Sequence, residues 1–398
     1  MGMMAARRWR GWGCGLTFII ETVCVVAVWL QLLHVVACGG FTSFVFGDSL
    51  VDAGNNDYLL TLSRADSPPY GIDFAPSGGN PTGRFTNGRT ISDILDEALG
   101  AKSFTPPYLA PNSEAEATVG GINYASGGSG ILDETGSFFI GRVPLREQVD
   151  YFEQSRRYIV SKMGENGTMR FLEKAIFSLT VGSNDILNYI QPTLPFLPRH
   201  TMVSPPTFQD YLISNFTLQL KRLHGMGARK MVVVGVGPLG CIPFVRALSL
   251  LPSGQCSSEA NDFIRAYNAR LRHVVDDLNR EMGPGVVFVY ANAYDIVMSI
   301  IRGYPQFGFE NADDPCCGGY IPPFICFQGN TTDEEKNSSV VCEDRSKYVF
   351  WDAYHPTEAA NRLIADNLLD GPKPLCYPIN LRQLHHYTPP PAAGKPPK

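Results

Sequence analysis

Five short apolar runs alternate with longer segments of helical periodicity, and this alternation constrains the fold more than any other feature. The runs are Ser43–Phe46, Gly120–Tyr124, Ala175–Val181, Lys230–Val236 and Val286–Tyr290. Two of the intervening segments, Phe208–His224 and Glu259–Met282, show the spacing of amphipathic helices. Buried strands that alternate with helices form a parallel sheet covered on both faces. We therefore expect an α/β fold with its functional site at the carboxyl edge of the sheet.

Composition limits the class of protein. The chain has 398 residues, 44% of them hydrophobic and 18% charged, and a formal net charge of -5. It can build a sizeable core, and no basic stripe offers a face for phosphates. We expect one large domain over residues 40–382 and no nucleic-acid partner.

Three segments stand outside the alternation of strands and helices. The Pro-rich stretch Gln191–Pro206 is interpreted as an excursion that forms a lid or rim. Residues 303–344, approximately, are rich in Gly, Pro and Cys and are predicted to form an insert tied by disulfides. Residues 383–398 are predicted to be a disordered tail.

The first 39 residues have the organisation of a secretory signal peptide. Three arginines precede the apolar stretch from Leu16 to Ala37, and small residues follow it. A retained membrane anchor is the alternative, because the stretch is long enough to span a bilayer. Glu21, Gln31 and His34 interrupt the stretch and favour the signal peptide. The mature chain then begins near Gly40 and has no stable membrane span.

Sequons agree with secretion. An N-x-[ST] sequence without proline begins at Asn166, Asn215, Asn330 and Asn337. The sequence thus predicts a secreted glycoprotein of the extracellular space or cell wall.

Cysteine usage agrees as well. Seven of the ten cysteines lie beyond residue 40. Cys241 and Cys256 bracket a short loop and are expected to pair. The four between residues 316 and 342 allow three connectivities, and the paired C-x-x-C spacing of a zinc site is absent from them. Cys376 is the candidate for the unpaired thiol.

One histidine lies in a catalytic context. His355 follows Asp352 by three residues, and Pro356 is predicted to begin a helix over Thr357–Leu369. A carboxylate at this spacing can fix the imidazole tautomer and stabilise the imidazolium. Other histidines of the chain are accounted for by surface, helix-end or terminal positions.

A candidate nucleophile follows the first apolar run. Ser49 comes directly after Gly47 and Asp48 and is expected at the start of a helix, whose N-terminus would stabilise an oxyanion. A serine in such a place is often only an N-cap. The G-x-S-x-G nucleophile elbow of α/β-hydrolases is absent.

Four sequence blocks in order carry a resemblance to a known family. They are Phe46-Gly-Asp-Ser-Leu50, extended to Asn56; Asn123-Tyr-Ala-Ser-Gly-Gly-Ser-Gly130; Val181-Gly-Ser-Asn-Asp185; and Asp352-Ala-Tyr-His-Pro356. Over residues 41–382 the chain resembles the plant-type branch of the GDSL lipase/esterase family, within the SGNH hydrolases. The resemblance implies a flavodoxin-like three-layer α/β/α sandwich with a five-stranded parallel sheet.

The resemblance also implies roles for individual residues. Ser49 would be the nucleophile, with Asp352 and His355 completing the catalytic group. The oxyanion hole would consist of the Ser49 N–H, the Asn184 amide and a glycine N–H, for which Gly128 is favoured and Gly127 stays open.

The predicted activity is hydrolysis of carboxylic esters through an acyl-serine, without metal or organic cofactor, by a monomer acting on small-molecule or lipid esters. The alternatives are an acyltransferase, a polysaccharide O-acetylesterase and a non-enzymatic binding protein. Apolar candidates for the rim are Phe138, Phe139, Phe196 and Phe324, which favour lipid-like acyl groups.

Overall fold

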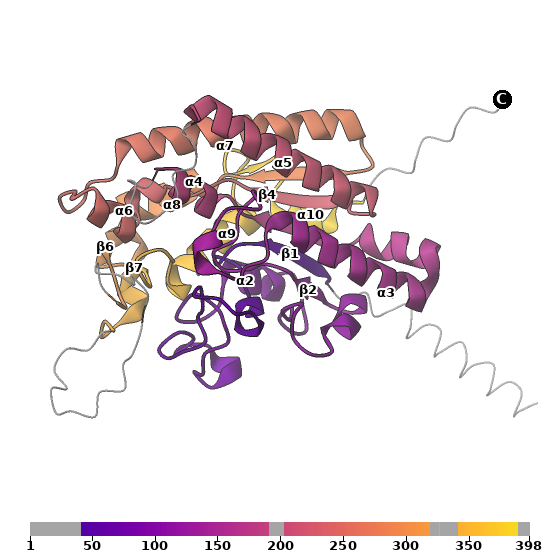
Figure 1. The fold of residues 1–398 in the computed structure, drawn as a ribbon, viewed down its shortest axis with the longest axis horizontal. Helices are drawn as coiled ribbons and strands as arrows, with labels where there is room; N and C mark the ends of the chain where they lie inside the picture. The colour runs from indigo at the N-terminus through magenta and orange to yellow at the C-terminus, as the bar shows by residue number, and fades with distance from the viewer. Residues whose placement is uncertain (1–40, 191–202, 319–325, 327–340, 389–398) are drawn as a thin grey trace, which may run out of the picture. The chain divides into compact units, whose positions relative to one another are not determined.

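Six strands form the central sheet of the computed structural model, which describes residues 41–190, 203–318, 326 and 341–388 (Figure 1). The strands are β1 (Ser43–Gly47), β2 (Gly121–Asn123), β3 (Ile176–Thr180), β4 (Lys230–Val234), β5 (Val287–Ala291) and β8 (Cys376–Tyr377). Their order is β2-β1-β3-β4-β5-β8, in which the first five are parallel and β8 is antiparallel to β5. The predicted flavodoxin-like sandwich is confirmed, and the order of its five parallel strands is the flavodoxin-like one. The two-residue strand β8 was not predicted, because two residues are too few to form an apolar run.

Helices cover both faces of this sheet. The α-helices are α2 (Ile91–Ala98), α3 (Leu145–Leu172), α4 (Ser183–Ile190), α5 (Pro205–Gly225), α6 (Pro243–Leu248), α7 (Ser258–Met282), α8 (Ala293–Arg302), α9 (Glu358–Asp370) and α10 (Leu381–His386). Short 3-10 turns are η1 (Asn55–Tyr58), η2 (Ala75–Ser77), η3 (Ser113–Thr118), η4 (Ser137–Phe139), η5 (Leu239–Cys241), η6 (Tyr304–Phe307) and η7 (Arg345–Lys347). Helices α5 and α7 lie side by side with α3 next to α5, whereas α9 contacts α2, α8 and α10 (Figure 1).

The two faces of the sheet carry different side chains. Register partners on parallel strands share a face, so Phe44, Phe177 and Met231 point to one side. There Phe44 and Phe177 both pack edge-on against Phe152 of α3, and all three rings are completely buried. We call this side, covered by α3, α5 and α7, the aromatic face. The opposite side, covered by α2, α8 and α9, is called the cavity face because a cavity lies between it and these helices.

Helix starts follow local capping chemistry. Ser204 caps α5, and Pro205 and Pro206 occupy its first turn. The predicted Pro-rich excursion therefore ends before Pro205, and its residues 191–202 lie outside the described residues. Thr357 caps α9, so the prediction that Pro356 occupies the first helical position is wrong: Pro356 precedes the cap.

The C-terminal boundary also differs from the prediction. Residues 383–386 belong to α10, not to a disordered tail. Leu384 is completely buried, and Lys230 at the start of β4 donates its Nζ proton to the His385 carbonyl at 2.7 Å. The apolar side chain and the buried lysine tie this helix to the sheet.

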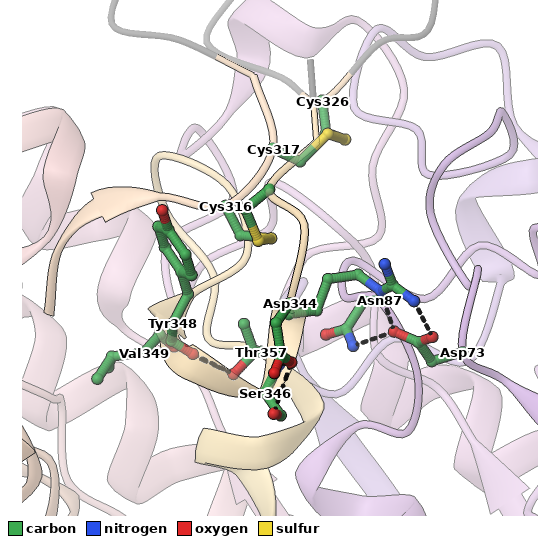
Figure 2. The surroundings of a disulfide bond; sticks show 12 residues. Asp73, Asn87, Cys316, Cys317, Cys326, Asp344, Ser346, Tyr348, Val349 and Thr357 are labelled. Carbon is green, nitrogen blue, oxygen red and sulfur yellow. Dashed lines mark hydrogen bonds and ion pairs between the residues drawn. A yellow bond between two sulfur atoms is a disulfide. The ribbon is translucent and has the colours of Figure 1, made fainter. Parts of the chain in front are cut away.

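Disulfides organise the insert after α8. The described bonds are Cys241–Cys256, as predicted, Cys316–Cys342 and Cys317–Cys326, and Cys376 is a buried free thiol. The second small sheet, β6 (Asn311–Pro315) with β7 (Tyr348–Phe350), lies beside these bonds. Figure 2 shows Asp73 next to this region. Its carboxylate accepts hydrogen bonds from the side chains of Arg345 and Asn87. The insert is therefore fastened to the loop before α2.

None of the helices in the described part of the chain is both long and apolar enough to cross a membrane. Asn166 and Asn215 are exposed on α3 and α5, whereas Asn330 and Asn337 lie outside the described residues. Glycosylation stays a prediction.

Candidate active site

Ser49 lies in a tight turn that follows β1. The Asp48 carbonyl accepts the N–H groups of Val51 and Asp52, which closes a single turn, and the Leu50 N–H bonds to Asp48 Oδ1. No regular helix follows, so the prediction that Ser49 begins a helix is wrong. The physical reason is that the Asp52 carboxylate captures the N–H groups of Gly54 and Asn55 and turns the chain away. A helix dipole therefore does not act on Ser49.

Gly47 makes this turn possible. A Cβ at Gly47 would lie 2.3 Å from the Thr180 carbonyl oxygen of β3. Both Gly47 backbone groups bond to the buried amide of Gln148 on α3. The close approach of β1 and β3 needs a glycine, and Gln148 holds the end of β1 in place.

The structure brings Ser49, His355 and Asp352 together. His355 Nε2 lies 2.7 Å from Ser49 Oγ, and His355 Nδ1 lies 2.8 Å from each oxygen of the Asp352 carboxylate. The Asp352 side chain is completely buried and that of His355 is 10% exposed. A proton on Nδ1 bonds to the carboxylate and leaves Nε2 as the acceptor for the serine proton.

Asp352 is held by donors from two distant parts of the chain. Its Oδ1 accepts the backbone N–H groups of Tyr354 and His355, both at 2.8 Å. Its Oδ2 accepts the Tyr70 hydroxyl at 2.8 Å. Burial is the main cause that raises the pKa of Tyr70 well above its ordinary value, and the negative charge of Asp352 is the second. The hydroxyl therefore stays protonated and acts as the hydrogen-bond donor.

The two predicted oxyanion donors lie on neighbouring loops. Asn184 is the second residue of α4 and donates from Nδ2 to the Ser129 carbonyl at 2.8 Å, which orients the amide and leaves its second N–H available. Gly128 has a φ of +79°, and a Cβ there would lie 2.6 Å from the Phe139 ring. Only a glycine fits this position.

Hydrogen bonding distinguishes the two candidate glycines. The Gly127 N–H donates to Asp52 Oδ2 at 3.0 Å. Within the described part of the chain, the N–H groups of Ser49 and Gly128 have no hydrogen-bond partner. Available donors thus exist at Ser49 and Gly128 but not at Gly127, which favours Gly128.

Buried polar side chains tie the loop of Ser49 to the loop of Gly128. Asn55 donates to the carbonyls of Asn123 and Ala125, and Asn56 donates to that of Gly127. These residues and Asp52 fix the spacing between the nucleophile and the glycine N–H. The sequence analysis gave them no role, although a cluster of Asp and Asn residues shortly after a candidate nucleophile was a usable signal.

Tyr70 and Gln148 were also missed, and no local signal identifies them. Tyr70 lies 282 positions from Asp352, and Gln148 lies 101 positions from Gly47. Only the tertiary fold brings each pair into contact.

Asp48 and Asp185 are buried carboxyl groups next to the site. Burial raises the pKa of Asp48 to about 7, and its Oδ2 has no hydrogen-bond partner among the described residues. Asp185 accepts the N–H groups of Ile131 and Leu132 and the Thr135 hydroxyl, but burial still raises its pKa. Asp185 thereby joins the Asn184 turn to the Gly128 loop.

Two of the four phenylalanines proposed for the rim lie within the described residues. Phe138 is 63% exposed, and Phe139 covers Gly128. Phe196 and Phe324 lie outside the described residues. No group of three side chains suited to hold a metal ion occurs in the described ranges.

Comparison with known proteins agrees with this arrangement. The model of the GDSL-like lipase/acylhydrolase family matches residues 44–368. The GDSL esterase/lipase At5g41890 of Arabidopsis thaliana is 59% identical over 352 residues, which cover 88% of this chain and 94% of that protein. Two further GDSL esterase/lipases of the same plant, At3g50400 and At4g16230, are 50% and 49% identical, each over 86% of this chain and 90% of their own length.

Proposed function

The chain belongs to the GDSL lipase/acylhydrolase family and is a carboxylic ester hydrolase, and we propose that it works through an acyl intermediate on Ser49. The observation that carries this proposal is the continuous chain of contacts from Ser49 Oγ through His355 to the buried Asp352 carboxylate. Such a chain raises the nucleophilicity of a serine hydroxyl, which is otherwise a weak nucleophile.

In the first half-reaction His355 Nε2 accepts the Ser49 proton while Ser49 Oγ bonds to the ester carbonyl carbon. The negative charge moves to the carbonyl oxygen, where the N–H groups of Ser49 and Gly128 and the Asn184 amide stabilise it. Asp352 stabilises the resulting imidazolium of His355. The imidazolium then protonates the alcohol as it departs, and the acyl group remains bound to Ser49.

In the second half-reaction water attacks the acyl-serine. His355 accepts a proton from this water and returns it to Ser49 Oγ, which releases the carboxylic acid. A sugar or lipid hydroxyl in place of water would give acyl transfer by the same steps. Deacetylation of a wall polysaccharide is a further candidate that differs only in the substrate.

The test is labelling by a fluorophosphonate together with hydrolysis of p-nitrophenyl esters. We expect mass spectrometry to locate one label on Ser49, and we expect both labelling and hydrolysis to disappear in Ser49→Ala and His355→Ala. A label on another residue, or hydrolysis that persists in Ser49→Ala, contradicts the proposal. Product analysis with a competing alcohol then distinguishes hydrolysis from acyl transfer.

We also propose secretion, which rests on the signal-peptide organisation of residues 1–39 and on the disulfides, since such bonds persist in oxidising compartments. Sequencing of the mature N-terminus tests it, and a start near Gly40 is expected.

A further inference from the structure

A cavity of about 100 Å³ lies between the cavity face of the sheet and the helices that cover it. Its floor includes Ser178 and Thr180 of β3 and Val234 of β4. These strands are central in the sheet, yet the three side chains are only partly buried. Their neighbours Phe177 and Leu179, which point to the aromatic face, are completely buried. Solvent-sized space therefore penetrates one side of the sheet and not the other.

The cavity begins at the loops that carry the proposed catalytic residues. Leu50 lines it and directly follows Ser49; Ser183 lines it and directly precedes Asn184. Tyr354 and Pro356 line it from either side of His355. The far wall comes from α8 and α9, where Ile301 and Ala360 face the space. The cavity thus lies next to the turns that carry Ser49, Asn184 and His355.

The lining selects an apolar occupant. Among the described residues that line the cavity, none carries a charge, and the few hydroxyl groups are Ser, Thr and Tyr side chains. A cavity of this kind does not hold water well, because water needs two to four polar partners. An alkyl chain loses nothing in such surroundings and gains about 0.8 kcal/mol per buried methylene, or about four-fold in affinity.

We propose that this cavity receives the acyl chain of the ester and restricts the enzyme to short and medium chains; this inference rests on the acyl-serine function proposed above. The acyl group is the occupant because it stays covalently bound to Ser49, whereas the alcohol must leave in mid-reaction. An engineered cavity of roughly 150 Å³ accommodates benzene, so about 100 Å³ gives room for about four carbons, and small rearrangements extend this to about six.

The experiment measures kcat/KM for p-nitrophenyl esters from acetate to palmitate. We expect an increase of about four-fold per methylene up to butyrate or hexanoate, followed by a decline. A profile that keeps rising to palmitate places the chain outside the cavity and overturns the inference.

Two variants test the location. Ser178→Leu fills the cavity, and we expect the hexanoate-to-acetate ratio of kcat/KM to fall at least 10-fold. Ile301→Ala enlarges it, and we expect the optimum to move toward longer chains by about two carbons. Ser214→Leu makes the same serine-to-leucine change on exposed α5 and should leave the profile unchanged. An unchanged ratio in both cavity variants overturns the inference.

A parallel series of alkyl acetates varies the alcohol instead of the acyl group. If the cavity variants alter this series and not the acyl series, the occupant is the alcohol and the inference is wrong. Absence of both ester hydrolysis and Ser49 labelling refutes the proposed function, and this inference with it. Hydrolysis with normal labelling but no chain-length effect refutes the cavity assignment alone.

Discussion

The same strands supply both faces of the central sheet, but the two faces are filled differently. On the aromatic face, Phe44 and Phe177 meet Phe152 of α3 without residual exposure. On the cavity face, Ser178 and Thr180 are smaller, and their surfaces remain partly accessible. The turn that carries Asp352 and His355 enters α9 on this second side. The difference indicates that one face provides stability and the other provides space for a substrate.

The largest expected effect is a loss of turnover from a substitution in the turn of Asp352 and His355, which leads into α9 on the cavity face. Asp352→Asn should lower kcat about 10,000-fold, because the amide no longer stabilises the imidazolium and holds the wrong tautomer. The melting temperature should change little, because the amide keeps the shape of the carboxylate. Steady-state kinetics and thermal unfolding measure the two quantities. A loss of stability in proportion to the loss of activity would make Asp352 a structural residue.

Neighbouring residues on β3 give the most direct test of the comparison. Phe177→Ala on the aromatic face should lower the free energy of unfolding by about 3–5 kcal/mol, because it leaves a cavity in a filled core. Ser178→Val on the cavity face should change it by about 1 kcal/mol or less, because it adds apolar volume to existing space. Urea unfolding measures both. Equal losses in the two variants would mean that the faces are equally filled.

Substitutions at the carboxyl edge of the sheet, where the two faces meet, should affect turnover without affecting stability. Asn184→Ala removes one oxyanion donor, and we expect kcat to fall roughly 100- to 1,000-fold. Wild-type turnover in this variant, on a substrate the enzyme hydrolyses, would exclude Asn184 from the mechanism. Asn215→Ala, a matched amide deletion on exposed α5, is the control.

Asp48, at the carboxyl edge of the sheet, should make stability depend on pH. Its pKa is about 7 in the folded protein against 3.8 ordinarily, so the folded state binds more protons between these values. Stability should therefore fall as pH rises from about 4 to about 7. In Asp48→Asn the fall should be shallower, with a gain of about 1–3 kcal/mol at pH 8 that disappears at pH 4. Parallel stability curves for the two proteins would show that Asp48 is not the titrating group.

The smallest effect is expected from Tyr70→Phe, which removes one donor from Asp352 and keeps the ring contacts with Phe85 and Trp351. Without this donor the carboxylate, and with it the imidazole ring that it orients, is held less firmly. We therefore expect kcat/KM to fall roughly 3- to 10-fold in steady-state kinetics.

Tyr151→Phe, whose hydroxyl bonds Glu147 on α3, is the matched control. A loss of thermal stability in proportion to the drop in kcat/KM would assign Tyr70 a structural role only.

Much of the fold could be predicted because its signals are local. Continuous apolar runs such as Lys230–Val236 and helical spacing such as that of Glu259–Met282 depend only on neighbouring residues. That β1 to β5 are parallel then follows from the alternation of strands and helices. Ser49 and the pair Asp352 and His355 were also predicted as candidates, because a strand end and a three-residue spacing can be recognised along the chain.

The sequence by itself therefore determined the α/β class, the parallel strands, the Cys241–Cys256 bond and the candidate catalytic blocks. Tertiary structure decided the turn at Ser49, the hydrogen bond that occupies the Gly127 N–H, the contact of Tyr70 with Asp352 and the cavity beside β3. The reason is physical: each of these depends on atoms from segments far apart in the chain. A carboxylate such as Asp52 can redirect a turn or occupy an N–H only after the fold has placed it there.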